Sequence, residues 1–156
     1  MTRVSQRLMI SAPRESVRLY LRDLDNLTKY SRRIFQVQLK SRDEHKVSFE
    51  ASGRFLGLPW KATLEAEFPT DGGLRLTLSR GGPLWLAGAS YHLRSVSGGT
   101  ILSNDEEYRL PFLLRPLSPL LKKIASETMD LELRVIKEGA EQLNRKIRLR
   151  EIESAL

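Results

Sequence analysis

A lone carboxylate, Glu132, interrupts the apolar face of the last helical segment of the chain. Helical spacing over residues 117–147 places it near the centre of a wide apolar face. That face comprises Leu121, Ile124, Ala125, Thr128, Leu131, Val135, Ile136 and Leu143. A buried carboxylate needs a cation, hydrogen-bond donors or water, or else its pKa rises. Two interpretations are open: Glu132 pairs with a neighbouring Arg for structural reasons, or it anchors or deprotonates a ligand.

Polar and aromatic residues alternate along the last two predicted strands, at 84–94 and 100–110. One phase presents the set Trp85, Ala87, Ala89, Tyr91, Leu93, Leu102, Asn104, Glu106 and Tyr108. Its polar members are suited to orienting a ligand in an apolar chamber, and a carboxylate or tyrosine among them could perform general acid–base chemistry. The other phase presents Ser103, Asp105 and Glu107. Because both sets are polar, the alternation leaves the inward-facing phase open. His92 shares a phase with Ser90 and Arg94 and is expected at the surface.

Small residues mark the same helix at Ala125, Gly139 and Ala140. Gly139 lowers helix propensity by about 1 kcal/mol relative to Ala. Such residues leave volume either for a closely packed neighbour or kink, or for a ligand.

The composition argues against several kinds of chemistry. The chain has no Cys and only two His, His45 and His92, so neither a thiolate site nor a multi-histidine metal site is expected. There is no arrangement for a Ser-His-Asp triad, no Gly-rich phosphate loop and no G-x-S-x-G elbow. We therefore expect no metal and no cofactor.

The net charge of +7 comes from 26 Lys and Arg against 19 Asp and Glu. Basic residues crowd the C-terminal turns (145–156), and elsewhere they mix with acids; the Arg32–Arg33 pair is interpreted as solvated surface. Nucleic acid is not expected as a partner, because these basic residues lack interleaved aromatics for base stacking. Residues 1–10 alternate instead of forming an apolar run, and no stretch reaches the length of a membrane span, so the expected compartment is the cytoplasm.

Periodicity predicts the elements that position these residues. Period-two alternation indicates a first strand at 3–10 and six more within 35–39, 47–51, 60–68, 74–78, 84–94 and 100–110. Pro13 begins a helix of about ten residues, and a second short helical piece runs through Leu27 and Tyr30. A final helix of about 30 residues is predicted over 120–150. This order predicts an α+β fold: a curved antiparallel sheet of about seven strands, with the helices packed on one face.

Three segments carry a family resemblance: "ISAPRESVRLYLRDLDNLTKY", "SGGTILSNDEEYRLP" and "ASETMDLELRVIKEGAEQL". With the element order, they make nearly the whole chain resemble the START-like helix-grip (SRPBCC) superfamily. Within it, the chain is most similar to the polyketide cyclase and coenzyme Q-binding branches and to the branch of the G-type subunit of carbon monoxide dehydrogenase. The resemblance implies a single ligand-binding domain over residues 1–156, with a hydrophobic ligand in an elongated cavity between the sheet and the C-terminal helix.

Three further segments combine Gly or Pro with large apolar residues: 54–60 (RFLGLPW), 79–88 (SRGGPLWLAG) and 110–121 (LPFLLRPLSPLL). They either cap the core or form apolar tips at the cavity entrance, where a membrane surface or a protein partner could bind.

The leading hypothesis is binding or transport of a hydrophobic small molecule such as a lipid, an isoprenoid quinone or a polyketide-like compound. The residues expected to contact it are Glu132, Thr128, Tyr91, Tyr108, Asn104, Glu106, Trp85, Ala125 and Ile136. The alternative is a polyketide cyclase, aromatase or dehydrase that uses Glu132, Glu106 or a tyrosine for acid–base work; no catalytic residue is assigned.

Overall fold

The computed structural model of the chain describes residues 2–55, 57–81 and 86–156. The elements are β1 (Thr2–Ile10), α1 (Arg14–Arg22), the 3₁₀ helix η1 (Leu24–Asn26), α2 (Leu27–Tyr30), β2 (Ile34–Arg42), β3 (Lys46–Phe55), β4 (Leu58–Glu67), β5 (Leu74–Gly81), β6 (Leu86–Val96), β7 (Gly99–Tyr108), the 3₁₀ helix η2 (Phe112–Leu117) and α3 (Ser118–Ala155).

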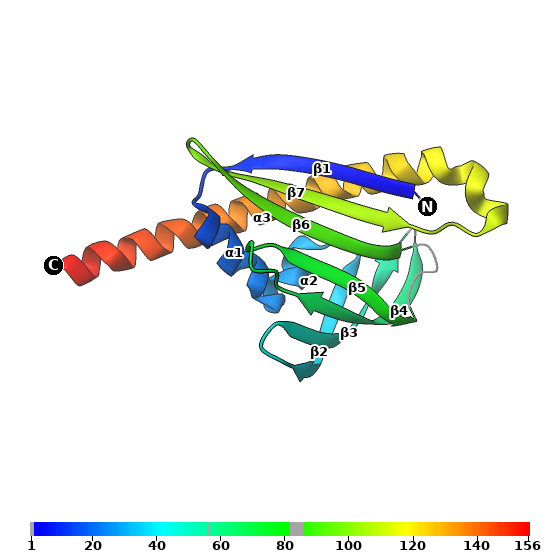
Figure 1. The fold of residues 1–156 in the computed structure, drawn as a ribbon, viewed down its shortest axis with the longest axis horizontal. Helices are drawn as coiled ribbons and strands as arrows, with labels where there is room; N and C mark the ends of the chain where they lie inside the picture. The colour runs from blue at the N-terminus through cyan, green and yellow to red at the C-terminus, as the bar shows by residue number, and fades with distance from the viewer. Residues whose placement is uncertain (1, 56, 82–85) are drawn as a thin grey trace.

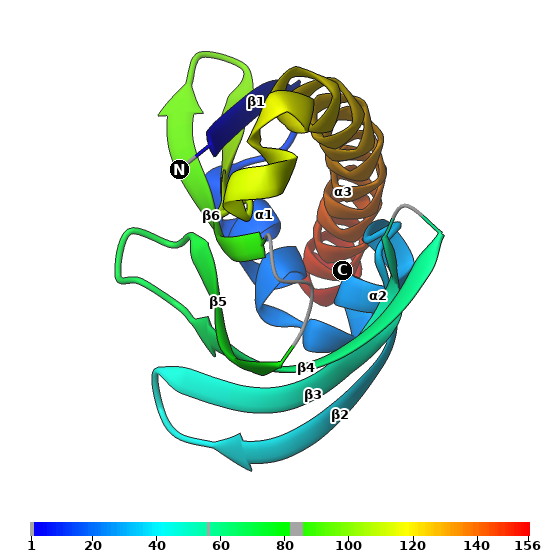
Figure 2. The ribbon, with the colours of Figure 1, turned by 90° about the vertical axis from the view of Figure 1, so that its right-hand side faces the viewer.

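Within these residues the seven strands form one antiparallel sheet in the order β1-β7-β6-β5-β4-β3-β2. Successive strands from β2 to β7 are neighbours. Strand β1 lies at the edge of the sheet beyond β7 and pairs with it from Thr2 opposite Tyr108 to Ile10 opposite Thr100. The sheet curves around the helices, as the view along α3 shows (Figures 1 and 2). The predicted α+β helix-grip architecture is therefore confirmed.

Strand alternation decides which side chains face the helices. In β7 every second residue is buried, and Asn104, Glu106 and Tyr108 are all at most 1% exposed. Ser103 and Asp105 point away and are only partly buried. The phase that the sequence left open is thus the one that carries Asn104 and Glu106 inward.

Helix α3 has 38 residues and is longer than the predicted helix of about 30. Its N-terminus holds Pro119, which fits the first turn because a proline there removes only an N–H that lacks an intrahelical acceptor. Its buried residues recur every three or four positions: Leu121, Ala125, Met129, Glu132, Leu133, Ile136, Ala140 and Asn144. Leu131, predicted on the apolar face, is 43% exposed, because the sheet covers the neighbouring stripe that contains Met129 and Leu133.

Gly139 allows helix α1 to pack closely against α3. A Cβ at this position would lie 2.6 Å from Oη of Tyr20 and closer still to its ring carbons. Tyr20 is itself buried in the main core. Of the two roles open to Gly139, close packing is the one that the structure shows.

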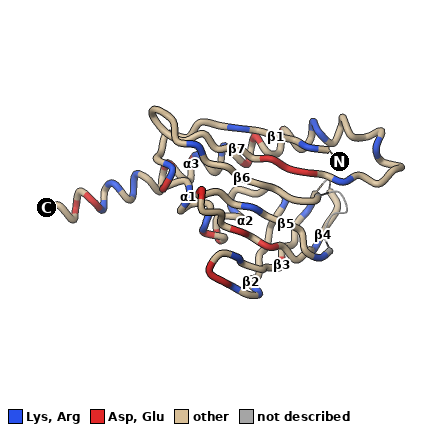
Figure 3. Tube along the Cα trace, in the orientation of Figure 1, with Lys and Arg blue, Asp and Glu red and all other residues tan. Residues whose placement is uncertain are grey.

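The last turns of α3 project beyond the rest of the molecule (Figure 1). Residues 148–156 are all exposed, and in this part of the helix the basic residues Arg148 and Arg150 are followed by the acidic residues Glu151 and Glu153 (Figure 3). In the described parts of the chain, no helix combines the length and apolarity that crossing a bilayer requires.

Candidate functional site

A pocket lies on the concave side of the sheet, beneath α2 and the middle of α3. It is partly open to solvent, and the volume accessible to the centres of water-sized molecules within it is about 50 Å³. Its lining is mostly apolar and aromatic, with one confined polar group of residues. The lining residues are Leu27, Tyr30, Ser31, Arg33, Ile34, Phe55, Trp60, Leu64, Leu76, Leu78, Gly88, Ala89, Tyr91, Glu106, Tyr108 and Glu132.

Arg33 reaches the pocket because the loop between α2 and β2 is fixed from both sides. The hydroxyl of Ser31 accepts hydrogen bonds from the backbone N–H groups of Arg33 (3.2 Å) and Ile34 (3.1 Å). On the other side, the Arg33 carbonyl accepts a hydrogen bond from the Arg54 N–H at 3.1 Å. This approach requires Gly53, since a Cβ there would lie 2.7 Å from the carbonyl carbon of Arg33. The loop therefore directs the Arg33 side chain inward, where it is only 13% exposed.

Arg33 joins two carboxylates and a phenol into one cluster. Its Nη1 donates to Glu106 Oε2 at 2.7 Å and to the Tyr108 hydroxyl at 3.0 Å. Its Nη2 donates to Glu132 Oε1 at 2.5 Å and also to Glu106 Oε1. The Tyr108 hydroxyl in turn donates to Glu106. Such a network satisfies the buried charges that an apolar environment would otherwise penalise.

The two carboxylates differ in their environments. Burial acts to raise the pKa of Glu106, but the charge of Arg33 and hydrogen bonds from Arg33, Tyr108 and Asn104 outweigh it and leave the pKa lowered. For Glu132, burial and the negative charge of Glu106 raise the pKa. Together they outweigh the opposing effect of the Arg33 charge, so the pKa is raised. Glu132 also accepts a backbone hydrogen bond from the Arg32 N–H at 3.2 Å. Of the two carboxylates, Glu132 is thus the one more ready to take up a proton.

Two buried polar atoms beside this cluster have no hydrogen-bond partner among the described residues: Nε1 of Trp60 and Oδ1 of Asn104. Trp60 is also one of the residues that line the pocket. Asn104 lies behind Glu106, to which its amide nitrogen donates at 3.4 Å.

Two aromatic residues form the wall next to the cluster. The rings of Tyr30 and Tyr91 meet edge to face, with centroids 6.3 Å apart. Burial raises the pKa of both phenols, so both are neutral around pH 7. They provide apolar surface and polar tips to the same chamber.

Several solved structures share the fold of this chain. The protein TTHA0849 from Thermus thermophilus aligns with a TM-score of 0.77 and 18% identity over 90% of this chain and 97% of its own. The Zhui aromatase/cyclase from Streptomyces sp. R1128 aligns with a TM-score of 0.74 and 11% identity over 90% and 93%. A START superfamily protein from Mycobacterium smegmatis aligns with a TM-score of 0.73 and 16% identity over 92% and 99%. The chain has the START-like helix-grip fold.

No protein-family model matches the sequence, and no curated protein matches it. The helix-grip likeness is therefore carried by structure and not by sequence. It covers 90% of this chain.

The helix-grip pocket brings together four of the residues expected to contact a ligand: Glu132, Glu106, Tyr91 and Tyr108 all line it. Asn104 is buried behind Glu106. Trp85 lies outside the described residues.

The remaining three expected contacts, all on α3, lie outside the lining. Ala125 is buried in a smaller cluster with Phe55, Tyr108 and neighbouring residues, and Ile136 is buried in the main core. Thr128 is only partly buried. Helix α3 therefore contributes Glu132 to the lining, whereas its other inward residues pack against protein.

Sequence reasoning does not identify Arg33, Tyr30 or Trp60 as pocket residues. Arg33 stands beside Arg32 in a polar stretch, where a solvated pair is the ordinary expectation, and for Arg33 that expectation is wrong. The one available signal is Glu132, since a carboxylate on an apolar face implies a cation elsewhere in the chain. His92, by contrast, is half-exposed as expected and lies 3.6 Å from Asp105.

Proposed function

We propose that this chain is one ligand-binding domain that binds a hydrophobic small molecule in the pocket, in the class of a lipid, an isoprenoid quinone or a polyketide-like compound. The observation that supports this most directly is the division of the lining into a broad apolar wall and one confined polar cluster. Small-molecule sites commonly have this composition, because apolar burial supplies affinity and a few polar groups fix orientation.

The cluster defines the polar part of the ligand. With both carboxylates ionised, Arg33, Glu106 and Glu132 together carry one negative charge, which disfavours a carboxylate or phosphate headgroup. Ionised Glu132 accepts from a hydroxyl, and protonated Glu132 donates to a carbonyl. The Trp60 N–H donates to either oxygen. A neutral hydroxyl- or carbonyl-bearing group is therefore the expected partner.

Native mass spectrometry tests the proposal on protein purified from a lipid-rich expression host. We expect a retained hydrophobic compound that denaturing extraction releases for identification. A folded protein that retains no compound, and that binds neither ubiquinone nor any of a panel of fatty alcohols, would contradict it.

A matched pair of variants then locates the compound. Glu132→Leu should weaken binding of a hydroxyl- or carbonyl-bearing ligand at least about tenfold, the usual consequence of losing about 1.4 kcal/mol. Glu127→Leu changes an exposed carboxylate on the same helix and should leave affinity unchanged. Tryptophan fluorescence of a Trp85→Phe background reports binding, because Trp60 is then the only indole. Equal affinity in both variants would place the ligand elsewhere.

One observation favours an enzymatic alternative, a cyclase or dehydrase for a polyketide-like substrate. Glu132 and Glu106 share one buried pocket with pKa values displaced in opposite directions, as general acid–base chemistry requires. Three structural neighbours also bear aromatase/cyclase names. Incubation with a poly-β-ketone distinguishes the candidates. An enzyme forms a cyclised product with loss of water faster than a protein-free control, and Glu132→Gln abolishes this acceleration. A carrier gives the same products at the same rate as its Glu132→Gln variant.

A further inference from the structure

Large apolar side chains are exposed together at one end of the molecule, on η2 and the first turn of α3. Phe112 and Leu113 are 77% and 86% exposed. We call this set the apolar tip; it comprises Phe112, Leu113, Leu114, Leu117 and Leu120. Contiguous exposed apolar residues on a folded protein mark a binding surface more often than a chance feature.

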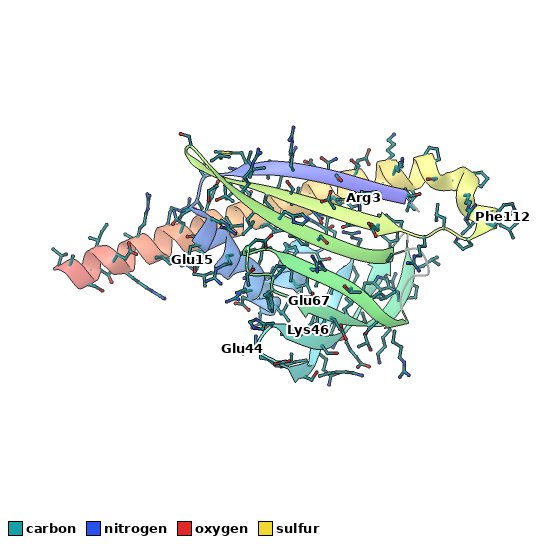
Figure 4. The ribbon with its side chains drawn as sticks, in the orientation of Figure 1. Arg3, Glu15, Glu44, Lys46, Glu67 and Phe112 are labelled. Carbon is teal, nitrogen blue, oxygen red and sulfur yellow. The ribbon has the colours of Figure 1, made fainter. Side chains whose placement is uncertain are left out.

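The apolar tip is held in an ordered position. Three prolines, Pro111, Pro116 and Pro119, restrict its backbone, and the Leu114 N–H donates to the Pro111 carbonyl at 2.9 Å. The segment forms the end of the molecule opposite the C-terminus, and Phe112 points away from the sheet there (Figures 1 and 4). The exposed side chains are thus presented outward by a fixed turn.

The chain segment that carries the apolar tip has charges of one sign. Residues 108–126 contain Arg109, Arg115, Lys122 and Lys123 and no Asp or Glu, although acids make up 19 of the 156 residues of the chain. All four basic residues are exposed. The guanidinium of Arg115 lies 5.6 Å from the centroid of the Phe112 ring, so a cation accompanies the most prominent aromatic residue.

We infer that the apolar tip and its basic rim dock on an anionic membrane surface. Apolar side chains enter the headgroup region of a bilayer, and Lys and Arg around them pair with anionic lipids. A second copy of the chain fits less well, because two acid-free surfaces with four cations each would repel one another. The exposed apolar residues at the other end, Leu149 and Ile152, lie among charges of both signs, with Arg148 and Arg150 beside Glu151 and Glu153, and lack this complementarity.

Flotation of the full chain with vesicles tests the inference and needs no knowledge of the pocket ligand. We expect binding to vesicles of phosphatidylserine and phosphatidylcholine in equal parts, and weak or no binding to phosphatidylcholine alone. Binding should weaken when salt rises from about 0.1 M to about 1 M, which shortens the Debye length from about 10 Å to about 3 Å.

Two variants separate the contributions of charge and apolar surface. Arg115→Gln/Lys122→Gln/Lys123→Gln should weaken binding about a hundredfold, since each cation near an anionic surface contributes about a fivefold factor. Phe112→Ser/Leu113→Ser should weaken it at least about tenfold. The altered side chains are exposed, so both variants should keep the wild-type melting temperature.

Matched controls lie at the other end of α3. Leu149→Ser/Ile152→Ser and Arg145→Gln/Lys146→Gln/Arg148→Gln should leave vesicle binding unchanged. Three outcomes would overturn the inference. The tip and control variants could lose vesicle binding equally, the wild type could bind the two kinds of vesicle equally, or it could bind neither. Concentration-dependent dimers, seen by ultracentrifugation without lipid, that Phe112→Ser/Leu113→Ser abolishes would also overturn it, because the occupant would then be a second copy of the chain.

Discussion

Nη2 of Arg33 and Oε1 of Glu132 lie 2.5 Å apart, although 99 positions separate the two residues in the sequence. Arg33 comes from the loop before β2, Glu132 from the middle of α3, and their shared partner Glu106 from β7. The three residues thus join the loop before β2, strand β7 and helix α3 at the polar wall of the pocket.

Arg33→Leu should destabilise the protein by about 3–5 kcal/mol at neutral pH, because it leaves two buried carboxylates without a cation. Without Arg33, burial raises the pKa of both carboxyls, Glu106 and Glu132, in the folded state. The folded state then binds protons at a higher pH than the unfolded chain, in which these carboxyls titrate near pH ~4.3. The deficit relative to wild type should therefore shrink as pH falls from about 8 to about 4. Urea titrations across this range measure it, and a pH-independent deficit would contradict the explanation.

Glu106→Gln and Glu132→Gln should have opposite pH dependences. The lowered pKa of Glu106 contributes stability above its unfolded value, and this contribution is lost as pH falls through the folded value. Glu106→Gln should thus cost about 1–3 kcal/mol at neutral pH and progressively less in acid.

The pKa of Glu132 is raised in the folded state. The wild type therefore loses stability as the pH rises from the pKa of this carboxyl in the unfolded chain to its pKa in the folded protein. Glu132→Gln removes this loss, so its stability relative to wild type should improve over the same interval. Urea titrations of both variants across this interval measure the difference, and parallel curves would show that the carboxylates share one environment.

Gly139→Ala should destabilise the protein by about 1–3 kcal/mol, even though Ala ordinarily stabilises a helix by about 1 kcal/mol relative to Gly. The added Cβ would overlap the Tyr20 ring. Removing the ring in Tyr20→Leu/Gly139→Ala should recover a substantial part of the loss, which thermal unfolding of the two single variants and the double variant measures. A stabilised single variant would mean that α1 moves aside at little cost.

Trp60→Phe separates a binding role from a structural one. Its buried Nε1 has no hydrogen-bond partner among the described residues, so removing it should leave the free energy of unfolding within about 1 kcal/mol of wild type. Ligand affinity measured by calorimetry should fall, since the donor to the ligand oxygen is gone. A variant that is less stable yet binds as tightly would assign Trp60 to packing alone.

The fold was predictable because most elements carry their own local signal. The alternation of β4, with Ala62, Leu64 and Ala66 inward and Thr63 and Glu65 between them, marks a strand with one covered face. Pro13 and Pro119 likewise fit helix N-termini. The limits of the apolar stripe on α3 carry a weaker signal: Leu131 and Met129 are both apolar, and only the sheet determines which is covered.

The site was predictable only in part, because its charged residues are far apart in the sequence and pair only through tertiary contacts. Glu132 was identifiable, since a carboxylate on an apolar stripe violates the local pattern. Arg33 violates no local pattern, because an arginine in a polar loop usually faces water. Its inward direction depends on Gly53, which lies on another strand and lets the two backbones meet. For β7 the phase became clear only once the buried partner of Glu106 was known.

The pairing of β1 with β7 also has a consequence for synthesis. Thr2 pairs with Tyr108, so the first strand leaves the ribosome long before its partner exists. At about 5–20 residues per second, it waits several seconds to tens of seconds with both hydrogen-bonding edges free. Strands β2 to β5 pair with sequence neighbours and can form earlier, whereas the pocket must be completed last, when α3 brings Glu132 to Arg33. The nascent chain should therefore expose its apolar concave face throughout most of translation.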